Sequence, residues 1–472
     1  MGFYKSKLHK GEKSMSKRKY LVLGMTALLS LTALFGCSDE EGGTTSGDKV
    51  ELKVMLTPQW KGVLDATEEG ADYDSFFKHA AERFEAEHEN VDITVEVVAG
   101  EQRDELLNVN LNGGTPPDVF FESVFAMGDY AHRGALVPIN DIVDEDAKAD
   151  IDQSYWDSVT FGDDIYFYPF SHNPGTFTYN ADMFKAAGLD QYIGEENEIK
   201  TWSLQEFEEI LKTLKEKLPS TQYANANAMG MYALNNQGDT WNLAYMRMFG
   251  NEFFDNDGNI ILDDADGVKA AEWMNNVYKS GFTNPGAESV SSNDVNALFQ
   301  NQQVAISFTN PVLFNNAKAD MDNGKMAKFD MRLANIPSES GDPLSFTYVT
   351  GATVFDTKDE ERIALSKEFV KFISTDEELV KSSKNSIPVR NSVAEQYKSE
   401  NPLFEAYAQN AQYIFNFTGN VPGYSQLRQV LYPELQAMFT GQITPADAVK
   451  NYQEKGNNVI SDAKADSVIF NK

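Results

Sequence analysis

The chain has 472 residues, a length that suggests about two or three domains, and its 42% hydrophobic and 12% aromatic residues are enough for a large buried core. Its formal net charge of −32 argues against a nucleic-acid partner, because phosphate binding needs clustered lysine and arginine side chains. The only cysteine is Cys37, so an intramolecular disulfide and a cysteine-based zinc site are both excluded.

The N-terminal segment, residues 1–37, is typical of a secretory signal peptide. Basic residues Lys17 to Lys19 precede the apolar run Leu21 to Phe35, which is too short for a comfortable membrane span. The run leads to Cys37 and resembles a bacterial lipobox, in which the cysteine becomes the lipidated first residue of the mature protein. Phe35 departs from the small or β-branched residue usual at its position. The alternative is a plain signal peptide with a spectator cysteine.

Residues 38–48 are rich in glycine, serine, threonine and acidic residues. This composition predicts a flexible tether between the lipid and the folded body. Met15 is an alternative start to Met1 and would give a more ordinary basic region.

The first half of the folded body alternates between strand and helix patterns. Strands are predicted at Leu52–Leu56, Ile93–Val97 and Asp118–Phe121, and helices at Phe76–Glu87 and Arg103–Leu111. Such alternation is typical of a parallel sheet flanked by helices, so we predict the α/β fold class.

Two aromatic strands follow, separated by a turn-rich centre. The first, Ile165–Phe170, is predicted to stop at Pro169, and the second covers Thr176–Tyr179. Asn180 is predicted to cap a short helix that ends at Gly188. A chain that leaves one sheet, turns and enters a second sheet is crossing between two lobes.

Further elements are predicted towards the C-terminus. They are a helix after Trp202, a hairpin at Phe253–Leu262, a strand within Phe346–Phe355, a helix at Asp359–Ile373 and a helix through Leu427–Met438. Calcium binding by Asp255–Asn259 is disfavoured, because an EF-hand loop needs glycine at position six and glutamate at position twelve.

Several short motifs, in chain order, resemble those of the extracellular solute-binding proteins, family 1. The pattern Tyr-Asn-x-x-x-Phe-x-x-x-Gly-Leu occurs from Tyr179 to Leu189. The other motifs lie at Thr115–Glu122, Tyr130–Leu136, Thr201–Trp202, Ala297–Ile306, Ile387–Arg390 and Gly441–Ala448. Asn301 stands where the family usually has glycine, a permissive substitution at a left-handed turn. The resemblance covers nearly all of residues 50–455.

The resemblance implies two lobes of the periplasmic-binding-protein-like type II fold. Each lobe would be a mainly parallel sheet flanked by helices, and a hinge of several strands would join them. We expect an N-lobe of residues 48–172 plus 342–376 and a C-lobe of 178–338 plus 385–472, with crossings near 171–178, 338–346 and 374–388.

The resemblance also implies the substrate-binding subunit of an ABC importer, for a sugar or oligosaccharide. A sugar presents a polar rim and an apolar face, so its site needs aromatic rings together with carboxylate, amide or guanidinium groups. The candidate ligand-binding residues at strand ends are Trp60, Glu122, His172, Asn173, Asn236, Trp241, Asn310 and Tyr424. Structural roles are the alternative: core packing for the tryptophans and turn formation for the asparagines beside proline.

Some positions differ from the maltodextrin binders of this superfamily. Asn173 stands where those proteins have a sugar-contacting carboxylate, Glu122 where they have an aromatic residue and Phe125 where they have an aspartate. Val312 replaces the tryptophan after their Gly-Pro pair. These differences argue against maltodextrin itself and leave a carbohydrate as the expected ligand.

No catalytic or metal-binding motif is found. His79, His88, His132 and His172 do not have metal-ligand spacing on one helix face, and the Gly-x-Ser-x-Gly and Gly-x-Gly-x-x-Gly motifs are absent. With 72 acidic residues, a carboxylate pair for glycoside hydrolysis is available by chance. We therefore expect no enzyme activity, cofactor or metal. The alternatives are a secreted lipoprotein that hydrolyses polysaccharides and a binding lipoprotein for a non-sugar solute.

The expected partners are a sugar ligand, the membrane permease subunits of an importer and the membrane itself, through the lipid on Cys37. We expect a monomer on the outer face of the cytoplasmic membrane of a Gram-positive cell. The sequence does not specify the sugar, its length or its linkage.

Overall fold

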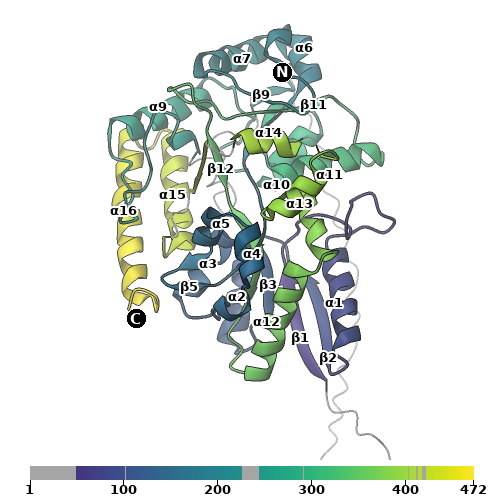
Figure 1. Ribbon diagram of the computed structural model, residues 1–472. Coiled ribbons are helices and arrows are strands. Elements are labelled where there is room, and N and C mark those ends of the chain that lie inside the picture. Colours follow the sequence, from purple (N-terminus) through teal and green to yellow (C-terminus); the bar gives the residue numbers. More distant parts are fainter. Residues whose placement is uncertain are drawn as a thin grey trace, which may run out of the picture. The chain divides into compact units, whose positions relative to one another are not determined.

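The computed structural model describes residues 49–100, 102–225, 244–290, 292–401, 403–410, 413–416 and 421–471. The predicted signal peptide and tether, residues 1–48 with Cys37, and the candidate ligand-binding residues Asn236 and Trp241 lie outside this part of the chain. Two large sheets, of six and five strands, organise the described residues (Figure 1). No helix in these ranges combines the length and the apolar character that a bilayer span requires.

The six-stranded sheet has the order β14-β6-β13-β3-β1-β2. Its strands are β1 (Val50–Leu56), β2 (Val91–Val97), β3 (Val119–Ser123), β6 (Tyr168–His172), β13 (Val349–Val354) and β14 (Ile387–Pro388). β1 pairs in parallel with β2 and β3, whereas β13 is antiparallel to both β3 and β6. The helices α1 (Ser75–Glu87) and α2 (Arg103–Asn112) connect the parallel strands, and α12 (Glu360–Thr375) follows β13. Phe76, Ala80 and Phe84 of α1 are buried at four-residue spacing, so one face of the helix packs into the core.

The five-stranded sheet has the order β8-β11-β7-β10-β9. Its strands are β7 (Thr176–Asn180), β8 (Ile199–Lys200), β9 (Tyr223–Asn225), β10 (Val304–Thr309) and β11 (Met331–Ala334). The central strand, β7, is antiparallel to both β10 and β11. The associated helices are α6 (Ala181–Ala187), α7 (Leu204–Lys217), α9 (Ala265–Lys279), α10 (Ser292–Gln300) and α11 (Pro311–Asp322). A separate hydrophobic core forms around this sheet, with Phe177, Trp202 and Phe207 among its buried residues.

Shorter elements complete the described chain. Before β7 these are α3 (Val124–His132), η1 (Asn140–Ile142), α4 (Glu145–Asp150), α5 (Gln153–Ser158), β4 (Thr160–Phe161) and β5 (Asp164–Ile165). Later come η2 (Asp190–Tyr192), β12 (Ser345–Thr347), η3 (Leu379–Asn385), α13 (Asn391–Tyr397), α14 (Leu403–Asn410), β15 (Ile414–Asn416), α15 (Tyr424–Phe439) and α16 (Pro445–Asp466). The two C-terminal helices pack against each other and against α9 (Figure 1).

The α/β class and most of the predicted elements are confirmed. The cap on α6 is also confirmed, because the side-chain oxygen of Asn180 accepts the backbone N–H of Met183 at 3.1 Å. Gly188 then ends the helix with φ of 76°, a left-handed conformation that glycine adopts without strain. The left-handed residue after α10 is Gln302 (φ 56°), so the assignment of that turn to Asn301 is wrong.

The prediction that Pro169 stops the first aromatic strand is wrong, since Pro169 lies within β6. β14 pairs with Ser171 and His172, and no other described strand lies beside β6 on that side at the proline. On the other side the pairing register shifts between Thr350 and Gly351, opposite Pro169. A proline without an N–H group is tolerated at such an edge and irregularity.

Two crossings between the sheets run side by side. The residues between β6 and β7 include Asn173 and Gly175, whose N–H groups donate to the carbonyls of Tyr348 at 3.0 Å and Phe346 at 2.7 Å. A Cβ atom at Gly175 would lie 2.0 Å from the Phe346 ring, so only glycine permits this approach. The exact lobe and hinge boundaries stay predictions.

Candidate functional site

The two sheets adjoin at edges where most of their strands end. β1 and β3 are parallel, and β6 and β3 are both antiparallel to β13, so β1, β3 and β6 end at one edge of the six-stranded sheet. In the other sheet, Thr309 at the end of β10 pairs with Thr176 at the start of β7. Because only residues 173–175 separate β6 from β7, the two edges must lie close together. Ligands of open α/β sheets bind at such carboxyl ends. We call the residues here the junction site: Arg103, Glu122, Phe125, His172, Asn173, Asn310, Tyr348, Tyr424 and Arg428.

Glu122 lies near the end of β3 in a network of hydrogen bonds. Its carboxylate accepts the hydroxyl of Thr57, the backbone N–H of Ser123 at 2.6 Å and the Ser123 hydroxyl at 2.8 Å. The Arg103 guanidinium lies 3.5 Å away and also pairs with Asp104 at 3.0 Å. The network fixes buried charges of both signs next to the aromatic residues of the site.

The charged state of this network follows from its partners. Burial alone would lower the pKa of Arg103, but the Asp104 and Glu122 carboxylates raise the pKa above its usual value. Burial would conversely raise the pKa of Asp104, yet Arg103 holds that pKa below its ordinary range. Both groups therefore stay ionised, as buried charges do when they are paired and hydrogen-bonded.

Three aromatic rings and one guanidinium group gather beside Glu122. Phe125 makes edge contacts with Tyr348, at 5.1 Å between ring centroids, and with Tyr424, at 6.4 Å. The guanidinium carbon of Arg428 lies 5.4 Å from the Phe125 centroid and 6.0 Å from that of Tyr424. This arrangement provides cation–π contacts and apolar ring surface in one place.

Tyr424 is positioned by the start of α15. The Asp129 carboxylate of α3 accepts the backbone N–H groups of Gly423 at 2.8 Å, Tyr424 at 3.0 Å and Ser425 at 2.7 Å. A carboxylate at a helix N-terminus satisfies free N–H groups and complements the helix dipole. Arg428 is four residues after Tyr424, so both lie on the same face of α15.

Asn310 connects the five-stranded sheet to the site. Its side-chain oxygen accepts the N–H of Leu313 at 2.9 Å and caps α11, while its amide nitrogen donates to the Tyr348 hydroxyl at 3.0 Å. Burial, together with the nearby Glu122 carboxylate, raises the pKa of Tyr348 well above its usual value, so the phenol remains protonated. Asn310 thus has the local structural role considered above, and it also makes a polar contact with Tyr348 across the junction.

His172 and Asn173 brace the crossing strands. The His172 ring hydrogen-bonds to the Thr347 hydroxyl at 3.1 Å, and burial lowers its pKa to about 3. Asn173 donates to the Thr350 hydroxyl at 3.1 Å and accepts the Ser386 hydroxyl at 2.7 Å. Their polar side chains are engaged within the protein in this conformation, and their contact with a ligand stays a prediction.

Trp60 lies beneath the site, in the core of the six-stranded sheet. Its ring stacks on Phe170 with centroids 5.6 Å apart and makes edge contacts with Phe76 and Phe121. Only 3% of the residue is exposed. Core packing, the alternative considered above, describes these contacts, and a role of Trp60 in ligand binding stays a prediction.

Six of the eight predicted ligand-binding residues are described, and five of them belong to the junction site. Sequence reasoning missed Arg103, Tyr348 and Arg428, and it singled out Phe125 only as a departure from related binders. The four-residue spacing between Tyr424 and Arg428 was the available signal for Arg428. Within the described ranges, no group of histidine and acidic side chains is arranged to hold a metal ion.

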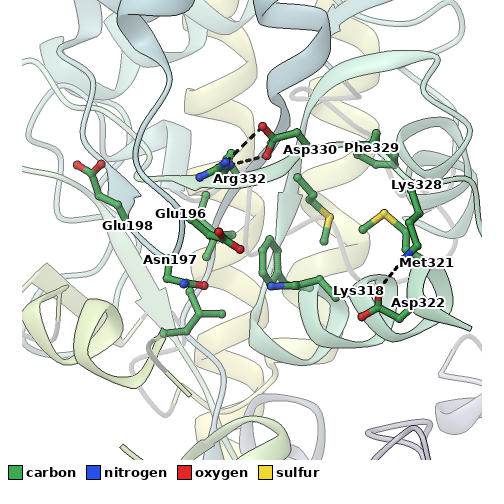
Figure 2. A pocket seen from close by; sticks show the side chains of 14 residues that line it. Glu196, Asn197, Glu198, Lys318, Met321, Asp322, Lys328, Phe329, Asp330 and Arg332 are labelled. Carbon is green, nitrogen blue, oxygen red and sulfur yellow. Dashed lines mark hydrogen bonds and ion pairs between the residues drawn. The ribbon is translucent and has the colours of Figure 1, made fainter. Parts of the chain in front are cut away.

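Two hollows lie elsewhere on the five-stranded half. A cavity of about 190 Å³ has an apolar floor that includes Phe314 and Met321 of α11, and its rim carries the ion pairs Arg332–Asp330 and Lys328–Asp322 (Figure 2). A wider hollow of about 610 Å³ lies between the start of α7 and one face of α9. None of the described candidate residues lines either hollow, so both are distinct from the junction site.

The family model that describes bacterial extracellular solute-binding proteins matches residues 67–379. A protein of Brucella abortus named as a binding protein is 21% identical over 393 residues, which covers 82% of this chain and 90% of the relative. Among solved structures, an ABC substrate-binding protein of Listeria monocytogenes in complex with cycloalternan has a TM-score of 0.69 and 17% identity, over 88% of this chain and 100% of that one. A receptor of Streptomyces glaucescens, solved unliganded and with acarbose, has a TM-score of 0.69 and 19% identity over the same shares. The fold is therefore the two-lobe fold of these binding proteins.

Proposed function

The chain belongs to the bacterial extracellular solute-binding proteins, and from that premise we propose that it captures a sugar or oligosaccharide for an ABC importer. Members of this family bind solutes and do not transform them, so the chain is a binding protein and not an enzyme. The hydrolase alternative is thereby set aside.

The observation that carries the carbohydrate proposal is the composition of the junction site. Phe125, Tyr348 and Tyr424 bring three rings together for the apolar face of a sugar; Tyr424 is only 4% exposed here, so separation of the two halves would have to uncover its ring. Glu122 and Asn310 add a carboxylate and an amide, which bind hydroxyl groups. The structural relatives captured with cycloalternan and with acarbose support the same ligand class.

Both sheets contribute to this site, which suggests how capture would work. Glu122 and Phe125 belong to the six-stranded half, and Asn310 to the five-stranded half. A ligand that contacts both halves favours the arrangement in which they are close together. The closed form would then deliver the ligand to the permease, while the lipid on Cys37 would hold the protein at the outer face of the membrane.

A carbohydrate panel tests this function. We expect one or more of maltose, maltotriose, acarbose, cycloalternan and tagatose to raise the Tm of the purified chain in a thermal-shift assay. The stabilising sugar should also reduce the radius of gyration in X-ray scattering and be recovered unchanged. Tyr424→Ala should lower its affinity about 5- to 150-fold, since a stacking aromatic contributes on the order of 1–3 kcal/mol.

Stabilisation by a peptide or a polyamine, with no response to any carbohydrate, would contradict the sugar assignment. It would favour the remaining alternative, a binding lipoprotein for a non-sugar solute.

A further inference from the structure

A second set of contacts joins the two halves of the molecule beside the junction site. Lys61, in the loop that follows β1, places its Nζ 3.4 Å from Oδ1 of Asp320 in α11. In the same region the Asn316 amide donates to the backbone carbonyl of Gln59 at 3.4 Å. We call the residues Gln59, Lys61, Asn316 and Asp320 the rim contact. Gln59 and Lys61 follow β1 of the six-stranded sheet, whereas α11 follows β10 of the five-stranded sheet. Each of the two interactions therefore joins the two halves.

The loop that carries Lys61 is internally braced. The Glu68 carboxylate accepts the backbone N–H groups of Val63, Leu64 and Asp65 at 2.7, 2.8 and 2.9 Å. The preceding residue, Trp60, is anchored among phenylalanines of the core. Lys61 is therefore presented from a fixed position on the six-stranded half.

The other partner is carried by a helix that starts at the junction site. Asn310 caps α11 and donates to Tyr348, while Asp320 lies ten residues further along, about 15 Å at 1.5 Å per residue. Asn316 and Asp320 are four residues apart and share one face of α11. Phe314 is buried in a hydrophobic cluster that includes Leu333 of β11 and also Ile387 of β14, so α11 packs against both halves and links the site to the rim.

We propose that the Lys61–Asp320 pair, supported by Asn316 and Gln59, is a closing latch that sets the ligand-free balance between open and closed forms. The proposal rests on the proposed function, in which the two halves approach each other to capture a ligand. The pair forms only when the halves are close, and in the open form both charges return to water. Apparent affinity depends on the fraction of molecules in the binding-competent form, so the latch raises affinity without touching the ligand.

The expected size of the effect is modest. The two side chains are 20% and 29% exposed, so solvent and salt screen their attraction. Ion pairs of this kind shift an equilibrium by about 1.5- to 5-fold. The closed fraction should accordingly decline as ionic strength rises.

Spin-label distances in the ligand-free full chain test the latch. Because Cys37 is the only cysteine, a Cys37→Ser background leaves introduced cysteines as the sole labelling sites. Ala86→Cys on α1 and Lys212→Cys on α7 are exposed positions, one on each half. Long distances between the labels report the open form and short distances the closed form. Lys61→Glu or Asp320→Lys alone should raise the ratio of long to short distances about 1.5- to 5-fold or more. The double reversal, Lys61→Glu with Asp320→Lys, should return the ratio to that of the parent.

The chain offers a matched control pair within one half. Lys328 and Asp322 lie 3.0 Å apart with side chains 71% and 68% exposed, and they do not span the two sheets. Lys328→Glu and Asp322→Lys make the same charge changes and should leave the distances unchanged. The latch would be overturned if Lys61→Glu and Asp320→Lys each gave the distances of the parent. It would also be overturned if the double variant kept the raised ratio of long to short distances. The distance measurement uses no sugar. A negative result would therefore contradict the latch and leave the proposed sugar-binding function, which the carbohydrate panel tests, unaffected.

Discussion

At the scale of single residues, Trp60 contacts three phenylalanine rings, and these contacts define the consequence of removing it. We expect Trp60→Ala to lower the free energy of unfolding by about 3–5 kcal/mol, because a large buried ring leaves a cavity. Urea denaturation of the ligand-free protein measures this loss. Val109→Ala, at a side chain that is 62% exposed, should change stability little. Unchanged stability together with weaker binding of a stabilising sugar would instead assign Trp60 to ligand contact.

His172 makes stability depend on pH. Its pKa in the folded protein is about 3, against an ordinary value of 6.5, because burial disfavours the charged imidazolium. Between these two values the unfolded chain binds more protons than the folded one, so stability falls as pH falls through this window.

From pH 6.5 to pH 5 the contribution of His172 should reduce the free energy of unfolding by about 2 kcal/mol, at 1.36 kcal/mol per pH unit. Urea titrations of the parent and of His172→Gln at several pH values check this, and the variant should lose stability less steeply. If the stability of the parent and of His172→Gln fell equally steeply with pH, the His172 imidazole would not remain neutral in the folded protein.

The chemistry of the junction site was only partly predictable from sequence. Glu122, Asn310 and Tyr424 could be found because strand ends and helix starts follow from local patterns. Tyr348 and Arg103 could not, since their roles arise when segments distant in sequence meet. No periodicity reports that the ring of Tyr348 will face Phe125 and the amide of Asn310.

At the scale of secondary-structure elements, the anchoring of α15 by Asp129 yields a prediction. Asp129→Ala removes the acceptor of three backbone N–H groups and should lower the free energy of unfolding by about 1–2 kcal/mol. It should also weaken binding of any stabilising sugar, because Tyr424 starts this helix. Asp447→Ala, at the solvent-exposed capping box of α16, is the matched control and should leave sugar affinity unchanged. Equal affinity losses in both variants would refute a specific role of Asp129.

Element positions were largely predictable, whereas strand pairing was not. Period-two alternation predicted β1 and β2, and a four-residue apolar spacing predicted α1. The placement of Pro169 inside β6 depended on the neighbours of that strand, which local sequence does not encode. At Gly351 a Cβ atom would lie 2.1 Å from the Tyr168 carbonyl, so the glycine reflects the close approach of a strand far away in sequence.

At the scale of the whole molecule, the proposed lipid on Cys37 predicts that the protein is retained at the membrane. We expect metabolic labelling with a palmitate analogue to mark the parent, because the lipobox-like sequence ends at this residue. Cys37→Ser should remain unlabelled and appear in the culture medium. A labelled Cys37→Ser protein would contradict lipidation at this position.

The antiparallel strand β13 lies between β3 and β6, and its pairing has a consequence for how the chain reaches its native state. Val354 pairs with Val119, so the six-stranded sheet joins residues more than two hundred positions apart, whereas the five-stranded sheet is completed within residues 176–334. Closing long loops is entropically costly and slows folding. During export the five-stranded sheet can therefore pair first, and its hydrophobic core is completed only when α15 and α16 follow. The six-stranded sheet must wait until residues 349–354 emerge, and strand edges that stay unpaired during that interval favour aggregation and proteolysis.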